Sequence, residues 1–303
     1  MSVTRSRQSK LPTILGTILG AICALIFAAA SSPAMETESA PLKEEFHQSY
    51  PLSGNGRITL DNLNGPVHIS AWERNEVKVD AIKRAYRKDR LQEATIRVDA
   101  QPDSIHIKTE YPEENHTFSF GKCEDDQGEP CLQHNPASVE YTLIIPRNAQ
   151  LDQVKLINGA LDITGVAGPV RASSVNGRVT ARGLSNETQL STINNRLEVT
   201  YDTMPSCQAR LHSVNGTLIL VIPSDAAVEV HARTVTGSIS NDFGLPVQDG
   251  RYVGHDLAGR LGNGGAHIEL KNVNGSITVK HASDGKPLSA ATSLLPLDRS
   301  RLY

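Results

Sequence analysis

Two cysteines, Cys123 and Cys131, enclose a short acidic stretch of the chain. In an oxidising compartment such a pair forms a disulfide that clamps the loop between them, whereas in a reducing compartment both stay free thiols. Their spacing fits no zinc motif. We predict a disulfide between them, with two free thiols as the alternative, and we expect Cys207 to behave as a small buried apolar residue.

The acidic residues of this stretch have the oxygen atoms that calcium binds, but not the spacing of a calcium loop. The order Asp-x-Asp-x-Asp-Gly is absent. The composition therefore favours a solvated acidic loop over a metal site. The residues concerned are Glu124, Asp125, Asp126 and Glu129.

A second charged stretch, around Tyr86, is basic. Its cations could contact anionic lipid head groups or acidic glycans. An isolated charge run more often only solvates a surface, and both interpretations stay open. The cations are Lys83, Arg84, Arg87, Lys88 and Arg90.

The sequence contains no motif of an enzyme site. It has no His-Glu-x-x-His, no Gly-x-Ser-x-Gly and no phosphate loop, and its 10 histidines are dispersed. The glycine-rich stretch 259–265 lacks dinucleotide spacing, so its glycines indicate tight corners. A net charge of −3 argues against general nucleic-acid binding. We predict no catalytic residue, no cofactor and no metal.

A repeated phrase organises the chain from Leu151 to Lys280. Each copy reads Val or Ile, a pair that is usually Asn-Gly, any residue, and then alternating apolar and polar residues. Periods near twenty residues indicate a stacked repeat architecture. A wider gap before the last copy leaves room for a degenerate copy near Gly262-Asn263-Gly264. The central pairs are Asn158-Gly159, Asn176-Gly177, Asn194-Asn195, Asn215-Gly216, Thr236-Gly237 and Asn274-Gly275.

The repeat predicts short strands joined at tight corners. Asn-Gly between alternating segments usually signals a β-hairpin, but a type I′ hairpin needs positive φ at both central residues, which is costly for Thr236. Positive φ at the second position alone suits a corner between two strands of one coil. The Val or Ile before each corner would then join an internal ladder. We predict an all-β fold, a single-stranded β-helix or β-solenoid with coils of about 18–21 residues, with a hairpin meander as the alternative.

The flanking segments complete the predicted organisation. Residues 1–34 have the basic start, apolar run and small-residue end of a signal peptide, or of a membrane anchor if they are not cleaved. Next come a linker at 35–51 and an irregular β-rich part at 52–150, with a loop at 111–136. The solenoid repeats occupy 151–280, and a disordered tail follows at 281–303.

Three stretches together resemble the bacterial putative-adhesin domain of unknown function. They are Asn62 to Ile69, Ala71 to Val77, and Tyr141 to Pro146, which leads into the Asn-Gly repeats. The resemblance covers roughly Gly54 to Lys280. It implies a right-handed β-helical protein that is exported or membrane-tethered and has no established catalytic residues.

The sequence therefore predicts a non-enzymatic protein of the periplasm, cell envelope or cell surface. Its solenoid would be a scaffold for binding a surface, a glycan or a protein partner. One alternative is a β-helix enzyme acting on polysaccharide, which would need carboxylates, cations and aromatic stacking surfaces on an outer face; aromatics make up only 4% of the chain. Another is an accessory component of envelope stress signalling. Membrane contact is expected only through an uncleaved N-terminal segment.

Overall fold

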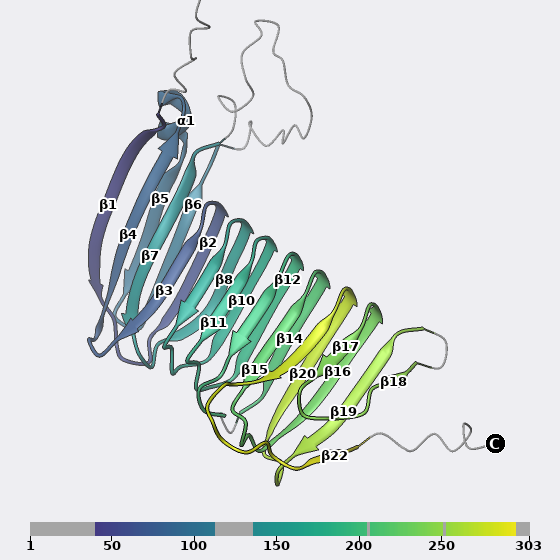
Figure 1. Cartoon of the computed structure of the whole chain (residues 1–303). Coiled ribbons are helices and arrows are strands. Elements are labelled where there is room, and N and C mark those ends of the chain that lie inside the picture. The colour runs from purple at the N-terminus through teal and green to yellow at the C-terminus, as the bar shows by residue number, and fades with distance from the viewer. Residues whose placement is uncertain (1–39, 113–135, 205–206, 251–252, 295–303) are drawn as a thin grey trace, which may run out of the picture. The chain divides into compact units, whose positions relative to one another are not determined.

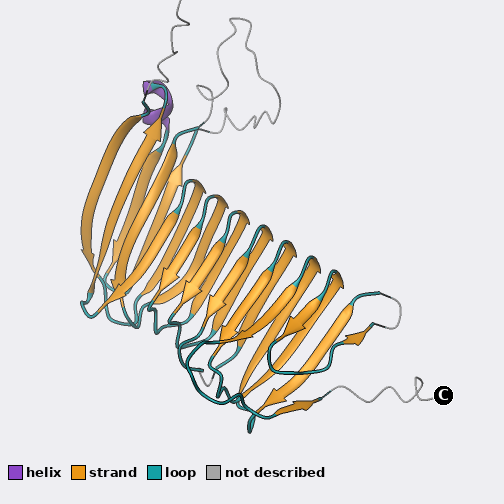
Figure 2. Cartoon of the chain, in the orientation of Figure 1, coloured by secondary structure: helices purple, strands orange, loops and turns teal. Residues whose placement is uncertain are grey.

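A computed structural model describes residues 40–112, 136–204, 207–250 and 253–294. The predicted signal peptide and both Cys123 and Cys131 lie outside these residues. The described residues are all-β, with two large sheets and one short helix among them (Figures 1 and 2). No helix of the described residues has the length and apolar character that a membrane crossing needs.

The first sheet has ten strands. Its first two strand pairs are antiparallel, and all its other neighbours are parallel. In spatial order the strands are β1 (Leu42–Pro51), β4 (Glu76–Ala85), β7 (Ser138–Pro146), β3 (Val67–Trp72), β9 (Leu161–Thr164), β11 (Val179–Arg182), β13 (Leu197–Thr200), β15 (Leu218–Ile222), β21 (Ile277–His281) and β17 (Ile239–Asn241).

The second sheet has twelve strands and is parallel in its middle and antiparallel at both ends. In spatial order they are β18 (Gln248–Asp249), β19 (His255–Leu261), β16 (Val228–Thr236), β20 (Ala266–Asn274), β14 (Ala209–Asn215), β12 (Thr188–Asn194), β10 (Val170–Asn176), β8 (Gln150–Asn158), β2 (Arg57–Asn64), β6 (Ser104–Glu110) and β5 (Thr95–Gln101), while β22 (Ala291–Ser293) pairs with β19. The helix α1 (Lys88–Glu93) follows β4.

Each repeated phrase joins one sheet to the other. The strand before a corner lies in the twelve-stranded sheet, and the strand after it lies in the ten-stranded sheet. Equivalent strands of successive repeats pair in parallel, as β8 does with β10 and β9 does with β11. Because the two strands that flank these corners never pair with each other, the corners are not hairpins, and the alternative of a hairpin meander is wrong.

The core lies between the two sheets and forms one continuous apolar cluster. Alternation along each strand sends every second side chain inward. Leu190 and Leu211 of the twelve-stranded sheet and Leu197 and Leu218 of the other are fully buried. Each such side chain stabilises the fold by roughly 1.5–3 kcal/mol relative to its exposure.

The order of strands in space departs from their order in the sequence. The last repeat, β20 with β21, lies between β14 with β15 on one side and β16 with β17 on the other (Figure 1). The degenerate copy expected near Gly262-Asn263-Gly264 is absent there. Instead β19 runs antiparallel to β16, and Gly262 and Gly264 adopt positive φ in the turn that leads into β20.

The structure differs from the predicted linker at 35–51. All ten residues of β1 pair antiparallel with β4. The side chains of β1 are mostly exposed. Phe46 and Tyr50 pack against the core, but most of this edge strand contributes backbone hydrogen bonds, which explains why its sequence reads as polar.

The structure also differs from the predicted disordered tail at 281–303, as far as residue 294. β22 pairs antiparallel with β19. The Asp284 carboxylate accepts the backbone N–H of Ser224 at 3.1 Å, and Lys286 Nζ lies 2.7 Å from an oxygen of Asp225. Polar contacts rather than apolar periodicity hold this segment, so the sequence pattern gave no sign of it.

Candidate functional site

The first residues of the corners form an Asn ladder, defined as Asn158, Asn176, Asn194, Asn215 and Asn274. They are direct partners in the parallel register of the twelve-stranded sheet. From Asn176 onward, each side-chain amide donates to the preceding member, with Nδ2 to Oδ1 distances of 3.0, 2.8, 3.1 and 2.9 Å along the ladder. The ladder thus presents a regular line of side-chain amides on the outside of the corners.

The second corner residues lie against the backbone of the neighbouring repeat. Gly159, Gly216, Gly237 and Gly275 have φ between +134° and +154°, and Asn195 has φ +116°. A Cβ on Gly216 would lie 1.9 Å from the carbonyl oxygen of Asn195. Both the backbone conformation and the close approach therefore favour glycine.

Gly177 is an exception to the expected positive φ, because it is not among the described residues with that conformation. A Cβ there would still lie 1.8 Å from the Gly159 carbonyl oxygen. Close packing of repeat on repeat, rather than φ, requires glycine at this corner.

A second set of polar side chains lies inside the corners. We call it the inner polar row; its members come two residues before the first corner residue and are almost fully buried. Thr192 Oγ1 donates to the Gly177 carbonyl at 3.3 Å, Thr234 Oγ1 to that of Gly275 at 3.1 Å, and Asn272 Nδ2 to that of Gly216 at 2.8 Å. These three donors satisfy carbonyls of the corners, whereas Ser174 Oγ and Ser213 Oγ have no hydrogen-bond partner among the described residues. The row comprises Asn62, Ser174, Thr192, Ser213, Thr234 and Asn272.

The side chain of the Val, Ile or Leu before each corner points to the solvent, so the predicted internal ladder at this position is wrong. Strand parity explains the difference: Leu190 and Thr192 point inward in β12, so Ile193 between Thr192 and the corner must point outward. Ile157, Ile193, Val214, Val235 and Val273 are 38–43% exposed. This aliphatic row, beside the Asn ladder, comprises Leu63, Ile157, Val175, Ile193, Val214, Val273 and Val235.

The basic stretch proposed to contact anionic surfaces lies at the end of β4 and in α1. Four of its five cations have an acidic partner. Lys83 is almost buried, with Nζ 2.6 Å from Glu44, and Arg84 contacts Glu140 at 2.5 Å. Arg87 pairs with Asp89 at 2.8 Å and Arg90 with Glu93 at 2.9 Å, while Lys88 is exposed. These ion pairs favour a solvated, internally neutralised surface over an anion-binding one.

Cys207 is half-buried and free. Its Sγ lies 3.5 Å from Oδ1 of Asn186. Cys207 is therefore more exposed, and in a more polar environment, than the predicted small buried apolar residue.

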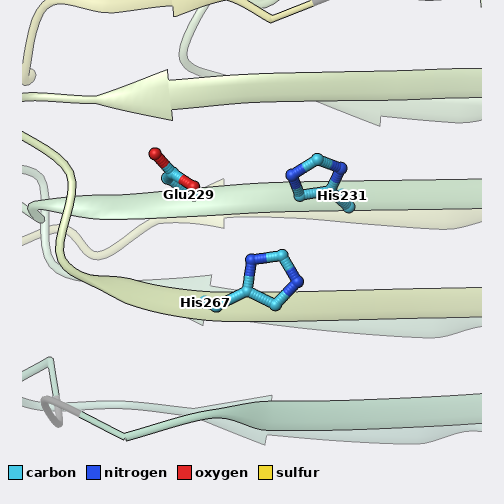
Figure 3. A group of neighbouring side chains, drawn as sticks. All are labelled: Glu229, His231 and His267. Carbon is cyan, nitrogen blue, oxygen red and sulfur yellow. The ribbon is translucent and has the colours of Figure 1, made fainter.

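The structure brings together two of the histidines that are dispersed in the sequence, and a glutamate beside them. Glu229 and His231 of β16 and His267 of β20 offer one ligand atom each, all within 4.8 Å of one another (Figure 3). The two rings have centroids 4.9 Å apart. Their separation in sequence hides the group, but alternation in β16 and β20 together with the parallel register would reveal it.

A shallow depression adjoins this group, over the small side chain of Ala258. Glu269 forms its wall with Lys271, whose hydrogen bond is the main cause that lowers the pKa of the Glu269 carboxyl. His212, on the neighbouring strand β14, has its pKa lowered mainly by burial and further by Lys271. The outer face at this end of the sheet therefore combines imidazoles, carboxylates and cations.

Comparison with known proteins gives structural similarity only. No family model matches the chain, and no curated protein is significantly similar in sequence. A putative cell adhesion protein from Clostridium sporogenes is 13% identical and has a TM-score of 0.44, over 80% of this chain and 100% of its own. A putative adhesin from Bacteroides fragilis is 11% identical, with a TM-score of 0.35 over 80% and 99%. A putative lipid binding protein from Parabacteroides distasonis is 11% identical, with a TM-score of 0.30 over 79% and 97%.

Proposed function

We propose that the chain is a non-enzymatic binding scaffold of the bacterial cell envelope and that its corners hold a linear polysaccharide. In this proposal the repeats are the coils of a β-solenoid, and the aliphatic row with the Asn ladder is the binding face. The observation that carries the proposal is the exposure of the aliphatic row. Location in the envelope rests on the signal-peptide character of residues 1–34.

The aliphatic row is unusual because its members are contiguous. Val, Ile and Leu are among the residues most often buried, and single exposed ones need no explanation. Here equivalent residues of successive repeats lie side by side, with Ile193 next to both Val175 and Val214 in register. Contiguous exposed apolar surface marks an interaction site on a soluble protein.

The spacing of the two lines of side chains favours a linear, regular ligand. Neighbouring strands lie about 4.7–4.9 Å apart, so each repeat offers one aliphatic side chain and one amide at that interval. Within the ladder each inner amide uses one N–H and one oxygen lone pair, which leaves a further N–H and lone pair for a ligand. A polysaccharide has apolar C–H faces and hydroxyl rims that can contact these two lines together.

Affinity in this proposal comes from many weak contacts. Aromatic stacking residues are absent from the aliphatic row, so one sugar unit would bind weakly. A chain that engages several repeats at once gains effective concentration for each further contact. Binding should therefore strengthen steeply with the length of the polysaccharide.

The test uses purified protein and size-fractionated envelope polysaccharide. We expect binding that increases with chain length and falls at least about tenfold in the Ile193→Asp/Val214→Asp variant, because buried charges oppose desolvation of the row. Thr164→Asp is the matched control, since Thr164 is exposed on β9 of the other sheet. Equal binding by both variants would contradict the proposal.

Two treatments distinguish the partner and the activity. Binding that survives protease treatment of the fraction but not glycan digestion identifies polysaccharide, and the reverse result identifies a protein partner and overturns the proposal. Release of soluble sugar by wild-type protein would favour the alternative of a polysaccharide-acting enzyme.

A further inference from the structure

The group of Glu229, His231 and His267 follows from strand geometry. Glu229 and His231 are two residues apart on β16, so both point to the outer face. His267 is the direct partner of Glu229 in the parallel pairing of β16 with β20. Figure 3 shows the two imidazoles and the carboxylate clustered over these two strands. All three residues are partly exposed, so a solute can reach them.

The donor set fits a first-row transition metal. Two imidazole nitrogens and one carboxylate oxygen are ligands that Zn²⁺ accepts, whereas Ca²⁺ and Mg²⁺ prefer oxygen alone. Bonds of about 2.0–2.2 Å place the ligand atoms on one Zn²⁺ roughly 3–3.5 Å apart. The ligand atoms here lie within 4.8 Å of one another. Small side-chain rotations would bring them to that spacing without moving the strands.

The carboxylate is oriented by a neighbouring cation but keeps one oxygen available. Arg260 on β19 contacts Glu229 Oε1 through Nε at 2.9 Å and through Nη2 at 2.7 Å. Both contacts use the same oxygen, so Oε2 is left for a metal. Such outer contacts commonly fix the orientation of ligating carboxylates.

The surroundings limit the affinity of the group. Glu269 is the direct partner of His231 in the pairing of β16 with β20. Its carboxylate forms an ion pair with Lys271. Arg260, Lys271 and Arg233 are the cations near the group, and their charge opposes a divalent ion. The carboxylates of Glu229 and Glu269 partly offset this positive charge, and Asp256 forms an ion pair with Arg233 at 2.5 Å.

We propose that Glu229, His231 and His267 bind one Zn²⁺ ion per chain, with water completing its coordination. The ion connects β16 to β20, two strands that are neighbours in space although β17, β18 and β19 lie between them in sequence. It therefore fastens the out-of-order repeat to the end of the stack. This site is independent of the polysaccharide-binding face.

The test is calorimetric titration of the chelator-treated full chain with ZnCl₂, followed by Co²⁺ absorption spectroscopy. We expect one equivalent of Zn²⁺ to bind and to raise the thermal midpoint, because an ion that binds only the folded state stabilises it. Co²⁺ should give ligand-field absorption bands, and acid should weaken binding because imidazoles must be neutral to ligate. Zn²⁺ should displace Co²⁺ from the same site.

Substitutions of the two histidines test whether these residues bind the ion. His231→Asn and His267→Asn should each weaken Zn²⁺ binding at least about tenfold, since even outer contacts are commonly worth that much. His106→Asn is the matched control, because His106 lies on β6 near the other end of the same sheet and should bind Zn²⁺ like the wild type. No Zn²⁺ binding by the wild type, or undiminished binding by His231→Asn/His267→Asn, would overturn the proposal.

Discussion

At the scale of the residue, the two positions of a corner have different roles. The first position provides an amide that is bonded to the same residue of the next repeat. The second position brings its backbone against the next repeat, as when Gly216 N–H donates to the Asn274 carbonyl at 3.0 Å. The first position therefore tolerates Thr236, whereas the second tolerates only Gly or a strained Asn195.

We predict that Gly216→Ala destabilises the protein by about 2–3 kcal/mol or more, because it combines unfavourable φ with a collision against backbone. Chemical denaturation measures the loss. Gly244→Ala separates the two causes, since Gly244 has φ +73° but no atom near its added Cβ. That control should lose only about 1 kcal/mol. Equal losses in the two variants would show that close packing of repeats contributes nothing.

The inner polar row leads to a prediction with a matched neighbour. Thr234→Val keeps the shape of a buried side chain but removes the donor to the Gly275 carbonyl, so we expect a loss of about 1–2 kcal/mol. Val235→Thr makes the opposite exchange one residue later, on the exposed side, and should change stability by less than about 0.5 kcal/mol. Thermal or urea unfolding compares the two. The opposite ranking would place Val235 inside.

At the scale of the element, alternation predicted strands well but assigned one face wrongly. The corner pairs and the strands after them could be predicted because Asn-Gly and period-two patterning carry local information. Alternation counted from the buried Leu190 sends the side chain of Ile193 outward. The prediction placed Ile193 in the core instead, because its side chain is aliphatic. The polar character of Ser174 gave no sign of burial, although its parity with Ala172 in β10 places it on the inner face.

Polar side chains also help to hold the edge strand β1. His47 Nδ1 lies 2.7 Å from Asp80 on β4, and this hydrogen bond is the main cause that raises the pKa of His47. Because the pKa of His47 is raised in the folded state, the pair stabilises β1 fully when the pH is below the pKa of the unfolded chain, about 6.5. This contribution is lost as the pH rises through the folded value.

We expect an NMR titration to give His47 a pKa above that of an unstructured histidine. In Asp80→Asn the pKa of His47 should fall towards the ordinary value, because the charged acceptor is gone. Glu45→Gln should cause a smaller fall, since Glu45 contributes the weaker hydrogen bond at 3.3 Å. An unshifted His47 in the wild type would mean that the pair does not form in solution.

At the scale of the whole molecule, stacking order is the feature that the sequence concealed. Each repeat looks alike, so a pattern of phrases predicts neighbours in sequence order. The structure instead places β20 between β14 and β16, and β19 on the other side of β16. Nothing local distinguishes the copies, because the Asn274 corner can face Asn215 or Thr236 equally well.

This order predicts the effect of a truncation. A chain that ends at residue 250 lacks both neighbours of β16, namely β19 and β20, and also lacks β21, the neighbour of β17. We expect amide hydrogen exchange at 228–241 to lose its protection, because those backbone groups have no sheet partner. Protection at 209–222 should fall partly, and protection at 151–200 should match the full chain.

A repeat that stacks in sequence order would behave differently. If β16 could pair directly with β14, the truncated chain would close the gap and keep its protection at 228–236. Both strands carry inward apolar side chains at matching intervals, so the core alone does not forbid this pairing. Retained protection at 228–236 would therefore mean that the position of β20 is a preference of the complete chain, whereas lost protection would show that β16 requires β19 and β20 in order to fold.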